Sequence, residues 1–380
     1  MPPAVFLVAG EISGDMQAAD LAAALRRADP QLTLLGIGGA RMASSGVRIL
    51  QDSTTWGVIG YVDPLLRLRT YLRRLRDVEA AVREARPDVL VLVDFAAFNL
   101  RLAERLRGLV PVAYYVPPMV SVRKGDRARK VAALGMRLLA TLRREADAYA
   151  SAGADVILVG HPAADLPQRA ASPAEARRRL ELPDRGPVVG LLPGSRLQEI
   201  RAHLTILLDA AGLVARTIPE AAFVLPVPAR EISAAVEPRT RNRRPPVRVV
   251  SEIHDAMRAA DVLVVASGTA TLEAAVLGVP MVVVYRLPVL SWMIINRLVT
   301  VRHAALPNIL AGREIVPELL QDRLTPAAVA EAVTSLLRDP ARGAAMRADL
   351  LAVAEGLGPP GAPARAADEV LRLIRWGRHA

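Results

Sequence analysis

Residues 264–280 read VVASGTATLEAAVLGVP. The apolar start is typical of a buried strand, and a helical pattern begins directly after Ser267-Gly268-Thr269. The first turn of a helix has backbone N–H groups without helical partners, and small side chains let an anion approach them. Glu273 follows about one helical turn later, where a carboxylate can accept hydrogen bonds from ribose hydroxyls. The segment predicts a site for a nucleotide diphosphate, with a tight turn and helix N-cap as the alternative.

The same order of apolar strand, small-residue loop and helix recurs along the chain. Residues 5–8 precede a Gly and Ser loop, and residues 188–192 precede Pro193-Gly194-Ser195-Arg196. Residues 89–93 form a continuous apolar run of the kind found in central parallel strands. With 380 residues, the chain is long enough for two α/β domains. We therefore expect an α/β protein with two Rossmann-like domains that face each other across a cleft.

Composition changes mark the expected domain boundaries. A polar linker follows Asp165, and Ser172-Pro173-Ala174-Glu175 has the spacing of a capping box. Residues 356–363 are rich in Gly, Pro and Ala, and a final helix is expected over residues 366–375. The predicted divisions are a first domain over 1–165, a second over 166–355, and a connector with a C-terminal helix over 356–380.

Charge and composition narrow the classes of partner. The net charge is +11, but aromatic residues make up only 3%, so the stacking surface that single-stranded nucleic acids need is absent. The excess positive charge favours phosphates, nucleotides or an acidic membrane face. With no cysteine, the chain has no disulfide and no thiolate metal site, in agreement with a reducing compartment. The first strand begins near Ala4 without a basic leader, so we expect a cytoplasmic protein.

A basic amphipathic stretch lies between residues 59 and 78. Its apolar residues recur at helical spacing and alternate with arginines. One interpretation is the core face of a domain helix; the other is a surface that contacts anionic lipid headgroups. The candidate membrane-contact residues are Val62, Leu65, Leu68 and Leu72.

Two charged residues follow predicted strands in positions suited to chemistry. Asp94 comes directly after the strand 89–93, at the sheet edge where ligands bind in open α/β folds. Arg196 follows the first strand of the second domain and could contact a phosphate with two hydrogen bonds. No cluster of acidic residues or histidines has metal-ligand spacing, so we expect helix ends and cations to neutralise a departing diphosphate. No Gly-x-Ser-x-Gly elbow of a serine hydrolase is present.

Residues 306–321 are harder to assign. We interpret residues 306–313 as a loop and residues 317–321 as a short helix.

Several motifs, taken together and in order, resemble those of the lipid-A-disaccharide synthase family along nearly the whole chain. They are VAGEISGD (8–15), GHPAAD (160–165), LLPGSR (191–196), ASGTATLE (266–273), LPNILAGR (306–313) and ELLQ (318–321).

The resemblance implies a GT-B fold and an inverting, metal-independent transfer with no cofactor. UDP-2,3-diacylglucosamine would donate its sugar to the 6-hydroxyl of 2,3-diacylglucosamine 1-phosphate, with release of UDP, at the cytoplasmic face of the inner membrane. Asp94 matches the general base of the family. The first domain would hold the acceptor and contact the membrane, and the second would hold the donor. The C-terminal helix is expected to cross back to the first domain, with a possible exchanged homodimer. Donor-binding positions carried over or inferred are Ser13, Gly194, Ser195, Arg196, Ser267, Gly268, Thr269, Glu273 and Asn308.

Two departures from the family pattern lie in the acceptor-side domain. The family usually has Ser-Pro-Ser-Val-Trp-Ala-Trp-Arg where this chain has residues 117–124, PPMVSVRK, and a second aspartate is replaced by Ala97. The alternatives are therefore a UDP-sugar transferase with another lipid acceptor, an isomerase like UDP-N-acetylglucosamine 2-epimerase, and a catalytically silent lipid-binding or nucleotide-binding protein.

Overall fold

The computed structural model describes residues 2–54, 56, 68–122, 126–227, 230–298 and 302–377. The chain forms two compact units, and each is described by itself. Unit 1 comprises Met1–Ala164, Val289–Thr300 and Leu357–Ala380. Unit 2 comprises Asp165–Pro288 and Val301–Gly356.

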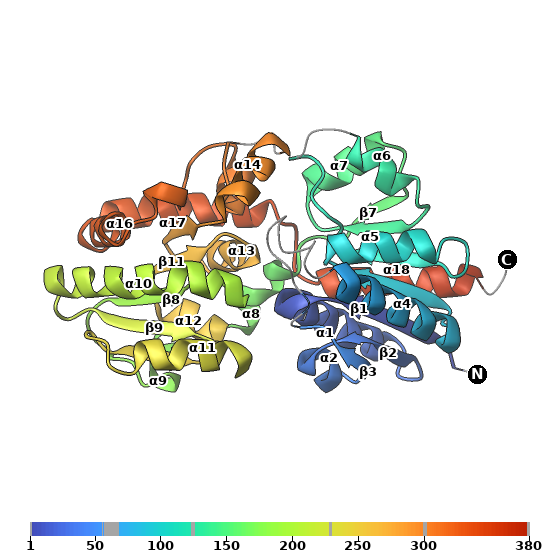
Figure 1. Ribbon diagram of the computed structural model, residues 1–380, viewed down its shortest axis with the longest axis horizontal. Coiled ribbons are helices and arrows are strands. Elements are labelled where there is room, and N and C mark those ends of the chain that lie inside the picture. The colour runs from blue at the N-terminus through green and yellow to red at the C-terminus, as the bar shows by residue number, and fades with distance from the viewer. Residues whose placement is uncertain are drawn as a thin grey trace. The chain divides into compact units, whose positions relative to one another are not determined.

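Unit 1 contains a parallel sheet in which β1 pairs with β4 near the centre. Strands β1, β2 and β3 of this sheet are labelled in Figure 1. Its strand order is β3-β2-β1-β4-β5-β6-β7. The strands are β1 (Ala4–Ala9), β2 (Thr33–Gly38), β3 (Arg48–Asp52), β4 (Val89–Val93), β5 (Val112–Tyr115), β6 (Arg137–Ala140) and β7 (Val156–Leu158). The helices are α1 (Glu11–Ala28), α2 (Ala40–Ser44), α4 (Leu68–Ala85), α5 (Ala96–Arg105), α6 (Arg127–Ala132), α7 (Arg143–Ser151), α14 (Val289–Leu298) and α18 (Ala362–Gly377), and a 3-10 turn spans Pro162–Asp165 at the end of the first segment.

Alternation along β1 divides the core of unit 1 into two layers. Val5 and Leu7 pack in a buried cluster with α1 and α18, whereas Phe6 and Val8 pack in a second cluster with α4 and α5. Successive side chains of a strand point to opposite faces, so a central strand covered by helices on both faces is apolar throughout. This explains the continuous apolar runs in the sequence.

The C-terminal helix α18 packs against α1, far from it in sequence. Its buried residues Ala366 and Val370 belong to the same cluster as β1. Glu369 is 6% exposed and accepts a hydrogen bond from Arg137 Nη1 on β6 at 3.2 Å. The expected return of this helix to the first domain is therefore confirmed.

Unit 2 repeats the architecture with the order β10-β9-β8-β11-β12-β13, again with parallel pairing (Figure 1). The strands are β8 (Val188–Leu192), β9 (Ala222–Pro226), β10 (Val247–Val250), β11 (Val262–Ala266), β12 (Met281–Tyr285) and β13 (Glu318–Leu320). The helices are α8 (Leu166–Arg169), α9 (Pro173–Arg179), α10 (Leu197–Thr217), α11 (Arg230–Thr240), α12 (Ile253–Ala259), α13 (Thr269–Val276), α15 (Leu306–Ala311), α16 (Pro326–Arg338) and α17 (Pro340–Glu355), with a 3-10 turn over Gln321–Arg323.

Two local predictions were wrong in unit 2. Residues 306–311 form the helix α15, where a loop was expected, and residues 318–320 form the edge strand β13, where a helix was expected. The three residues of β13 pair with β12 from Val283 to Tyr285. A strand this short carries no readable alternation, so its tertiary partner decides its structure.

In both sheets the strand order reverses direction at one point. The chain moves outward from β1 to β3 and then returns to place β4 beside β1; likewise it moves from β8 to β10 and then places β11 beside β8. Loops at the carboxyl ends of the two strands diverge at such a point, which is where open α/β sheets bind ligands. The reversal points are therefore the first places to look for a site in each unit.

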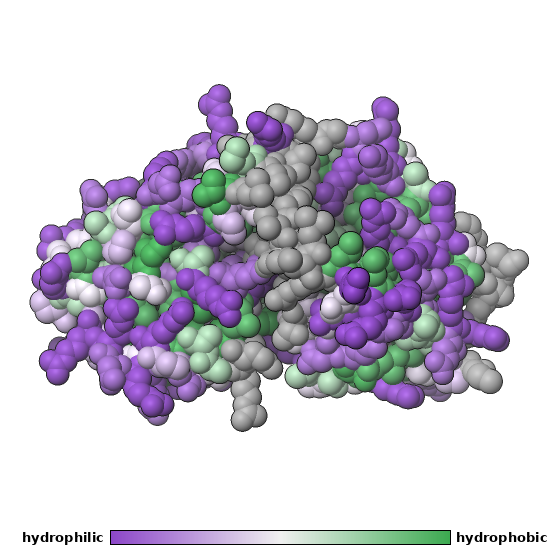
Figure 2. All heavy atoms as spheres, viewed as in Figure 1, coloured by the Kyte–Doolittle hydropathy of each residue, from purple (hydrophilic) through white to green (hydrophobic). Residues whose placement is uncertain are grey.

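Hydrophilic residues cover most of the visible surface of each unit, with hydrophobic residues in small separate areas between them (Figure 2). Within the part of the chain that the structure describes, every helix is too short or too polar to span a bilayer.

Candidate active site

Asp94 lies at the reversal point of unit 1, directly after β4. Both Asp94 and the following Phe95 have left-handed backbone conformations, with φ of 46° and 49°. Two consecutive non-glycine residues in this region are strained, and such strain persists only where neighbouring groups enforce it. The Asp94 side chain is partly exposed at the sheet edge.

Three hydrogen bonds enforce the Asp94 backbone. Its N–H donates to the Tyr115 carbonyl at 3.1 Å, and its carbonyl accepts from Tyr114 Oη at 2.7 Å and Asn99 Nδ2 at 2.8 Å. Burial, together with the nearby Asp94 carboxylate, raises the pKa of the Tyr114 hydroxyl well above its usual value, which keeps it a donor. Asp94 is thus held at a fixed position at the end of its strand.

The loop after β1 lies beside Asp94 because β1 and β4 are neighbours. A Cβ atom at Gly10 would overlap the ring of Phe95, so glycine is required for the two loops to approach. Ser13 lies in the first turn of α1 and is partly exposed. The structure therefore brings Ser13 and Asp94 to the same edge of the same sheet.

Asp15 of the VAGEISGD motif has a structural task. Its carboxylate is 3% exposed and accepts hydrogen bonds from the backbone N–H groups of Gly39 (2.7 Å), Arg41 (3.1 Å) and Met42 (3.2 Å). These are the N–H groups at the start of α2, so an acidic side chain already occupies the position that an anion would take at the Gly38-Gly39 loop.

Hydrogen bonds with α7 hold residues 118–121 of the loop after β5, where the chain departs from the family pattern. Glu145 is buried and accepts from Val120 N at 2.6 Å and from the Ser121 hydroxyl. Tyr149 Oη donates to the Pro118 carbonyl at 2.7 Å, and burial raises the pKa of this phenol. Because β5 pairs with β4, this loop lies next to the strand that carries Asp94.

In unit 2, the loop after β8 is organised by Glu199 of α10. The Glu199 carboxylate, 6% exposed, accepts from Ser195 N (2.9 Å), Arg196 N (3.3 Å) and Arg196 Nη1 (3.0 Å). Gly194 has φ of 123° and lies against Glu199 without room for a Cβ atom. Gly194, Ser195 and Arg196 are thus fixed at the reversal point of unit 2.

His203, one turn further along α10, links this loop to the end of β12. It is fully buried; its Nδ1 lies 2.7 Å from the Pro193 carbonyl, and its Nε2 lies 2.9 Å from Arg286 N. Since a backbone N–H can only donate, Nε2 accepts and Nδ1 carries the proton, which defines a neutral imidazole. Burial lowers the pKa of His203 and favours the same form.

Ser267, Gly268 and Thr269 form the turn between β11 and α13, beside the β8 loop. Ser267 Oγ donates to the Ala304 carbonyl at 2.7 Å, which ties the turn to the segment before α15. Gly268 is exposed, with open space where a Cβ atom would point. Glu273, on the second turn of α13, lies 3.3 Å from His254 Nε2 of α12. Because β8 and β11 are neighbouring parallel strands, the loops that follow them lie at the same edge of the unit 2 sheet.

Asn308 is fully buried, and its amide is used within the protein. Its Nδ2 donates to the Val316 carbonyl (2.9 Å) and Glu318 Oε1 (2.7 Å), and its Oδ1 accepts from the N–H groups of Ile315 (2.7 Å) and Val316 (3.0 Å). The side chain therefore has no capacity left for a direct hydrogen bond to a ligand. Glu318 also accepts from Ala304 N at 2.9 Å, so this network supports the segment that holds Ser267.

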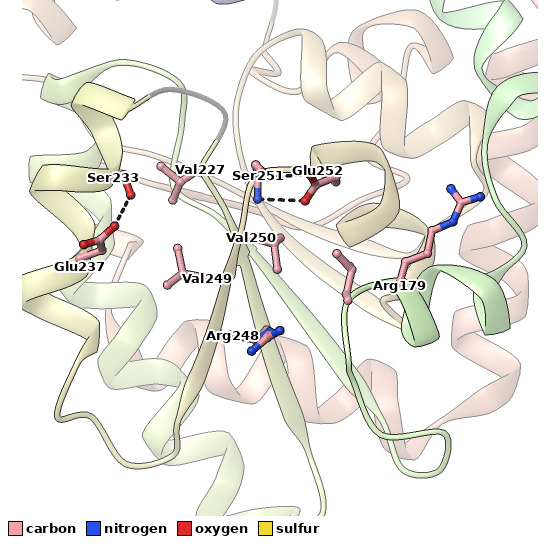
Figure 3. A pocket seen from close by; sticks show the side chains of 10 residues that line it. Arg179, Val227, Ser233, Glu237, Arg248, Val249, Val250, Ser251 and Glu252 are labelled. Atoms are coloured by element: carbon pink, nitrogen blue, oxygen red, sulfur yellow. Dashed lines mark hydrogen bonds between the residues drawn. The ribbon is translucent and has the colours of Figure 1, made fainter.

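A cavity of about 410 Å³ opens at the carboxyl ends of β9 and β10, the same edge of the unit 2 sheet (Figure 3). Several of its polar side chains are paired with one another. Ser233 Oγ donates to Glu237, and Ser251 Oγ donates to Glu252. The lining arginines are also paired, Arg179 with Glu175 and Asp255, and Arg248 with Glu181. The cavity is lined by residues of α9, α11 and the segments around the ends of β9 and β10, and its arginines are already neutralised.

Two of the four candidate membrane-contact residues, Leu68 and Leu72 of α4, are 47% and 38% exposed, whereas Leu75 of the same helix is buried in the core. Helix α4 therefore has one face in the core and one in solvent, which agrees with both interpretations of the basic stretch. Val62 and Leu65 lie outside the described residues.

Among the residues that the structure describes, no group of three or more histidine or acidic side chains has a geometry that could hold a metal ion.

Sequence reasoning missed Glu199, His203 and Glu318. The signal for Glu199 was its position three residues after Arg196, the spacing of a capping box. His203 follows four residues later, on the same helix face. Glu318 had no comparable signal, because its role depends on the unrecognised strand β13.

The sequence of this chain is similar to those of known proteins along nearly its whole length. A family model described as Lipid-A-disaccharide synthetase matches residues 5–356. A lipid-A-disaccharide synthase of Myxococcus xanthus is 39% identical over 382 residues, covering 99% of each chain. One from Anaeromyxobacter sp. is 41% identical over 375 residues, covering 98% of this chain and 97% of the relative.

Solved structures with the same fold share little sequence. A Staphylococcus aureus MnaA co-structure with UDP has a TM-score of 0.68 at 13% identity, covering 99% of this chain and 97% of that chain. The MurG structure from Acinetobacter baumannii has a TM-score of 0.55 at 14% identity, covering 98% and 100%. These likenesses establish the fold of two Rossmann-like domains, of GT-B type. The match of the family model to nearly the whole sequence and the identities of about 40% show that this chain belongs to the lipid-A-disaccharide synthase family.

Proposed function

We propose that the protein transfers 2,3-diacylglucosamine from UDP-2,3-diacylglucosamine to 2,3-diacylglucosamine 1-phosphate and releases UDP. The observation that carries this proposal is the position of the candidate residues at the reversal points. Asp94 and Ser13 lie at that of unit 1, and the Pro193–Arg196 and Ser267–Thr269 segments lie at that of unit 2. Membership in the synthase family supports the choice of reaction.

Asp94 would act as the general base on the acceptor. The reaction breaks the bond between the anomeric carbon and the diphosphate oxygen and forms a bond from that carbon to the acceptor 6-oxygen. The proton of the acceptor hydroxyl passes to the Asp94 carboxylate, and UDP leaves with the bonding electron pair. A base must lie within hydrogen-bond reach of the hydroxyl, and the enforced backbone of Asp94 supports such a fixed position.

Unit 2 would bind the donor. Arg196, with Gly194 and Ser195, lies beside the turn of Ser267, Gly268 and Thr269, where a cation and a helix start can together stabilise the leaving diphosphate. Glu273 would accept hydrogen bonds from the ribose. Asn308 would contribute indirectly, because its amide is fully engaged in holding the segment that fixes Ser267.

We further propose that the protein acts in the cytoplasm on the inner-membrane face, where its acylated substrates reside. Leu68 and Leu72 are exposed on α4 among arginines, and the net charge is +11. Both features favour contact with anionic headgroups. A homodimer that exchanges α18 would use the same contacts that α18 makes with α1. Sedimentation equilibrium tests this: a protomer mass of 40.7 kDa at all concentrations would exclude it.

Product analysis tests the reaction. Purified protein with both acylated sugars is expected to yield one disaccharide 1-phosphate for each UDP, as followed by mass spectrometry. Release of UDP only with another lipid alcohol would identify a different acceptor. Conversion of UDP-N-acetylglucosamine to its 2-epimer would identify an isomerase. UDP binding without any product would identify a silent binding protein.

A further inference from the structure

Glu199 is a buried acid of unit 2 beside the loop after β8, in the candidate donor site. Its two oxygens lie within 3.4 Å of donors from two strand ends: three from the loop after β8, and Tyr285 Oη at the end of β12. Both side chains of the ion pair are shielded, Glu199 at 7% and Arg196 at 30% exposure. An ion pair in such surroundings is less screened by water than one on the open surface.

The same contacts determine which groups of the loop can meet an anion. The backbone N–H groups of Ser195 and Arg196 both donate to Glu199 Oε2. These amides are therefore engaged inside the protein, although the loop resembles a phosphate-binding turn in sequence. Recognition of a diphosphate by this loop then depends on the Arg196 guanidinium, whose planar fork of donors suits phosphate oxygens.

We propose that Glu199 is a positioning residue of the donor site. One carboxylate oxygen holds the loop amides, and the other orients the Arg196 guanidinium toward the diphosphate of the UDP-sugar. This inference rests on the proposed function. The opposite role follows from the negative charge of Glu199. In that role its carboxylate would compete with the diphosphate for the Arg196 guanidinium. The two roles predict opposite changes in UDP affinity.

Glu175, in the first turn of α9, provides a comparison for Glu199 within the same unit. Ser172 Oγ accepts from Glu175 N at 3.2 Å at the start of α9, and Glu175 pairs with Arg179. Glu175 is 40% exposed, and its helix α9 precedes β8 in the chain. Glu175 therefore combines a capping position and an arginine partner outside the loops after β8 and β11.

The test is Glu199→Gln. Glutamine also serves in capping boxes, so the start of α10 is retained while the charge that orients Arg196 is lost. We expect UDP to bind about tenfold more weakly in isothermal titration, a loss within the range of one charged hydrogen bond. We expect KM for the donor to rise with a smaller change in kcat. Glu175→Gln should leave UDP affinity unchanged.

A double-mutant cycle separates positioning from a general structural effect. In an Arg196→Ala background, Glu199→Gln should cause no further loss of UDP affinity. Tighter or unchanged UDP binding in Glu199→Gln, or an equal loss of UDP affinity in the Arg196→Ala background, would overturn the inference.

If Glu199→Gln does not fold, Arg196→Lys tests the role of the oriented guanidinium, because lysine keeps the positive charge but lacks the planar fork of donors. UDP affinity equal to the wild type in Arg196→Lys would also overturn it. Absence of UDP binding by the wild type would instead contradict the proposed function.

Discussion

At the scale of single residues, the candidate site depends on backbone conformations that the sequence does not reveal. Asp94 was predicted from its place after an apolar strand, but its positive φ and that of Phe95 arise from hydrogen bonds to residues 5 to 21 positions away. For Asn308 the sequence did not reveal the hydrogen bonds of the side chain. It was predicted as a donor-pocket residue from the family motif, yet its side chain is consumed by contacts within the protein.

Gly10→Ala tests the close approach of the loops after β1 and β4. The backbone of Gly10 is extended, so alanine meets no conformational barrier, but its methyl group would overlap the Phe95 ring, which stacks on Phe98 at 5.2 Å. We expect the free energy of unfolding to fall by about 1–3 kcal/mol, as for an overpacked core, and transfer to fall with it. Chemical denaturation and a UDP-release assay measure both.

Gly343→Ala is the matched control. Gly343 lies within α17, and an added methyl group there makes only ordinary contact at 3.8 Å. Alanine should stabilise this helix by about 0.5–1 kcal/mol. Equal stability of Gly10→Ala and the wild type would show that the two loops are not packed as described.

At the scale of elements, the strands with continuous apolar runs could be predicted because their length and flanking glycines distinguish them from helices. The strand β13 and helix α15 could not, because three and six residues carry too little periodic signal. The face of α10 that carries Glu199 and His203 was also missed. Its function depends on strand ends that meet only in the folded sheet.

His203 predicts a pH dependence of stability. Its folded pKa is lowered, and its neutral ring bridges Pro193 and Arg286. Above about pH 6.5 the ring is neutral in both the folded and unfolded states. As the pH falls below that value, the unfolded state binds the proton first, so the free energy of unfolding decreases, by at most about 1.4 kcal/mol per pH unit from this residue.

Urea denaturation at pH 7.5 and 5.5 measures this effect. His203→Gln should be less stable than the wild type at pH 7.5, but it should lose less stability between the two pH values. A pH difference in His203→Gln as large as that of the wild type would refute the assignment.

At the scale of the whole molecule, two parallel-sheet units and the return of α18 followed from the sequence pattern and family resemblance. The assignment of Val289–Thr300 to unit 1 did not, because the segment lies within the sequence of the other unit. The surface properties also belong to this scale. The net charge of +11 gives long-range attraction to anionic membranes, whereas exposed leucines give local contact.

Membrane contact through α4 is tested by vesicle sedimentation. With both Leu68 and Leu72 replaced by serine, the protein should bind anionic phospholipid vesicles several-fold more weakly, because apolar area that enters the interface is removed. Binding of the wild type should also weaken as salt screens the arginines. Serine at Leu109 and Leu351, which are 55% and 43% exposed elsewhere, should have no effect. Equal losses in the two double variants would exclude a specific role of α4.

The most direct test of the central claim compares Asp94→Asn with Arg196→Ala in two assays, UDP binding by calorimetry and UDP release from the acylated donor and acceptor. If unit 1 supplies the base and unit 2 binds the diphosphate, Asp94→Asn should bind UDP as the wild type does but lose at least about a hundredfold in turnover. Arg196→Ala should bind UDP at least about tenfold more weakly. Full turnover in Asp94→Asn, or unchanged UDP affinity in Arg196→Ala, would contradict this division of roles.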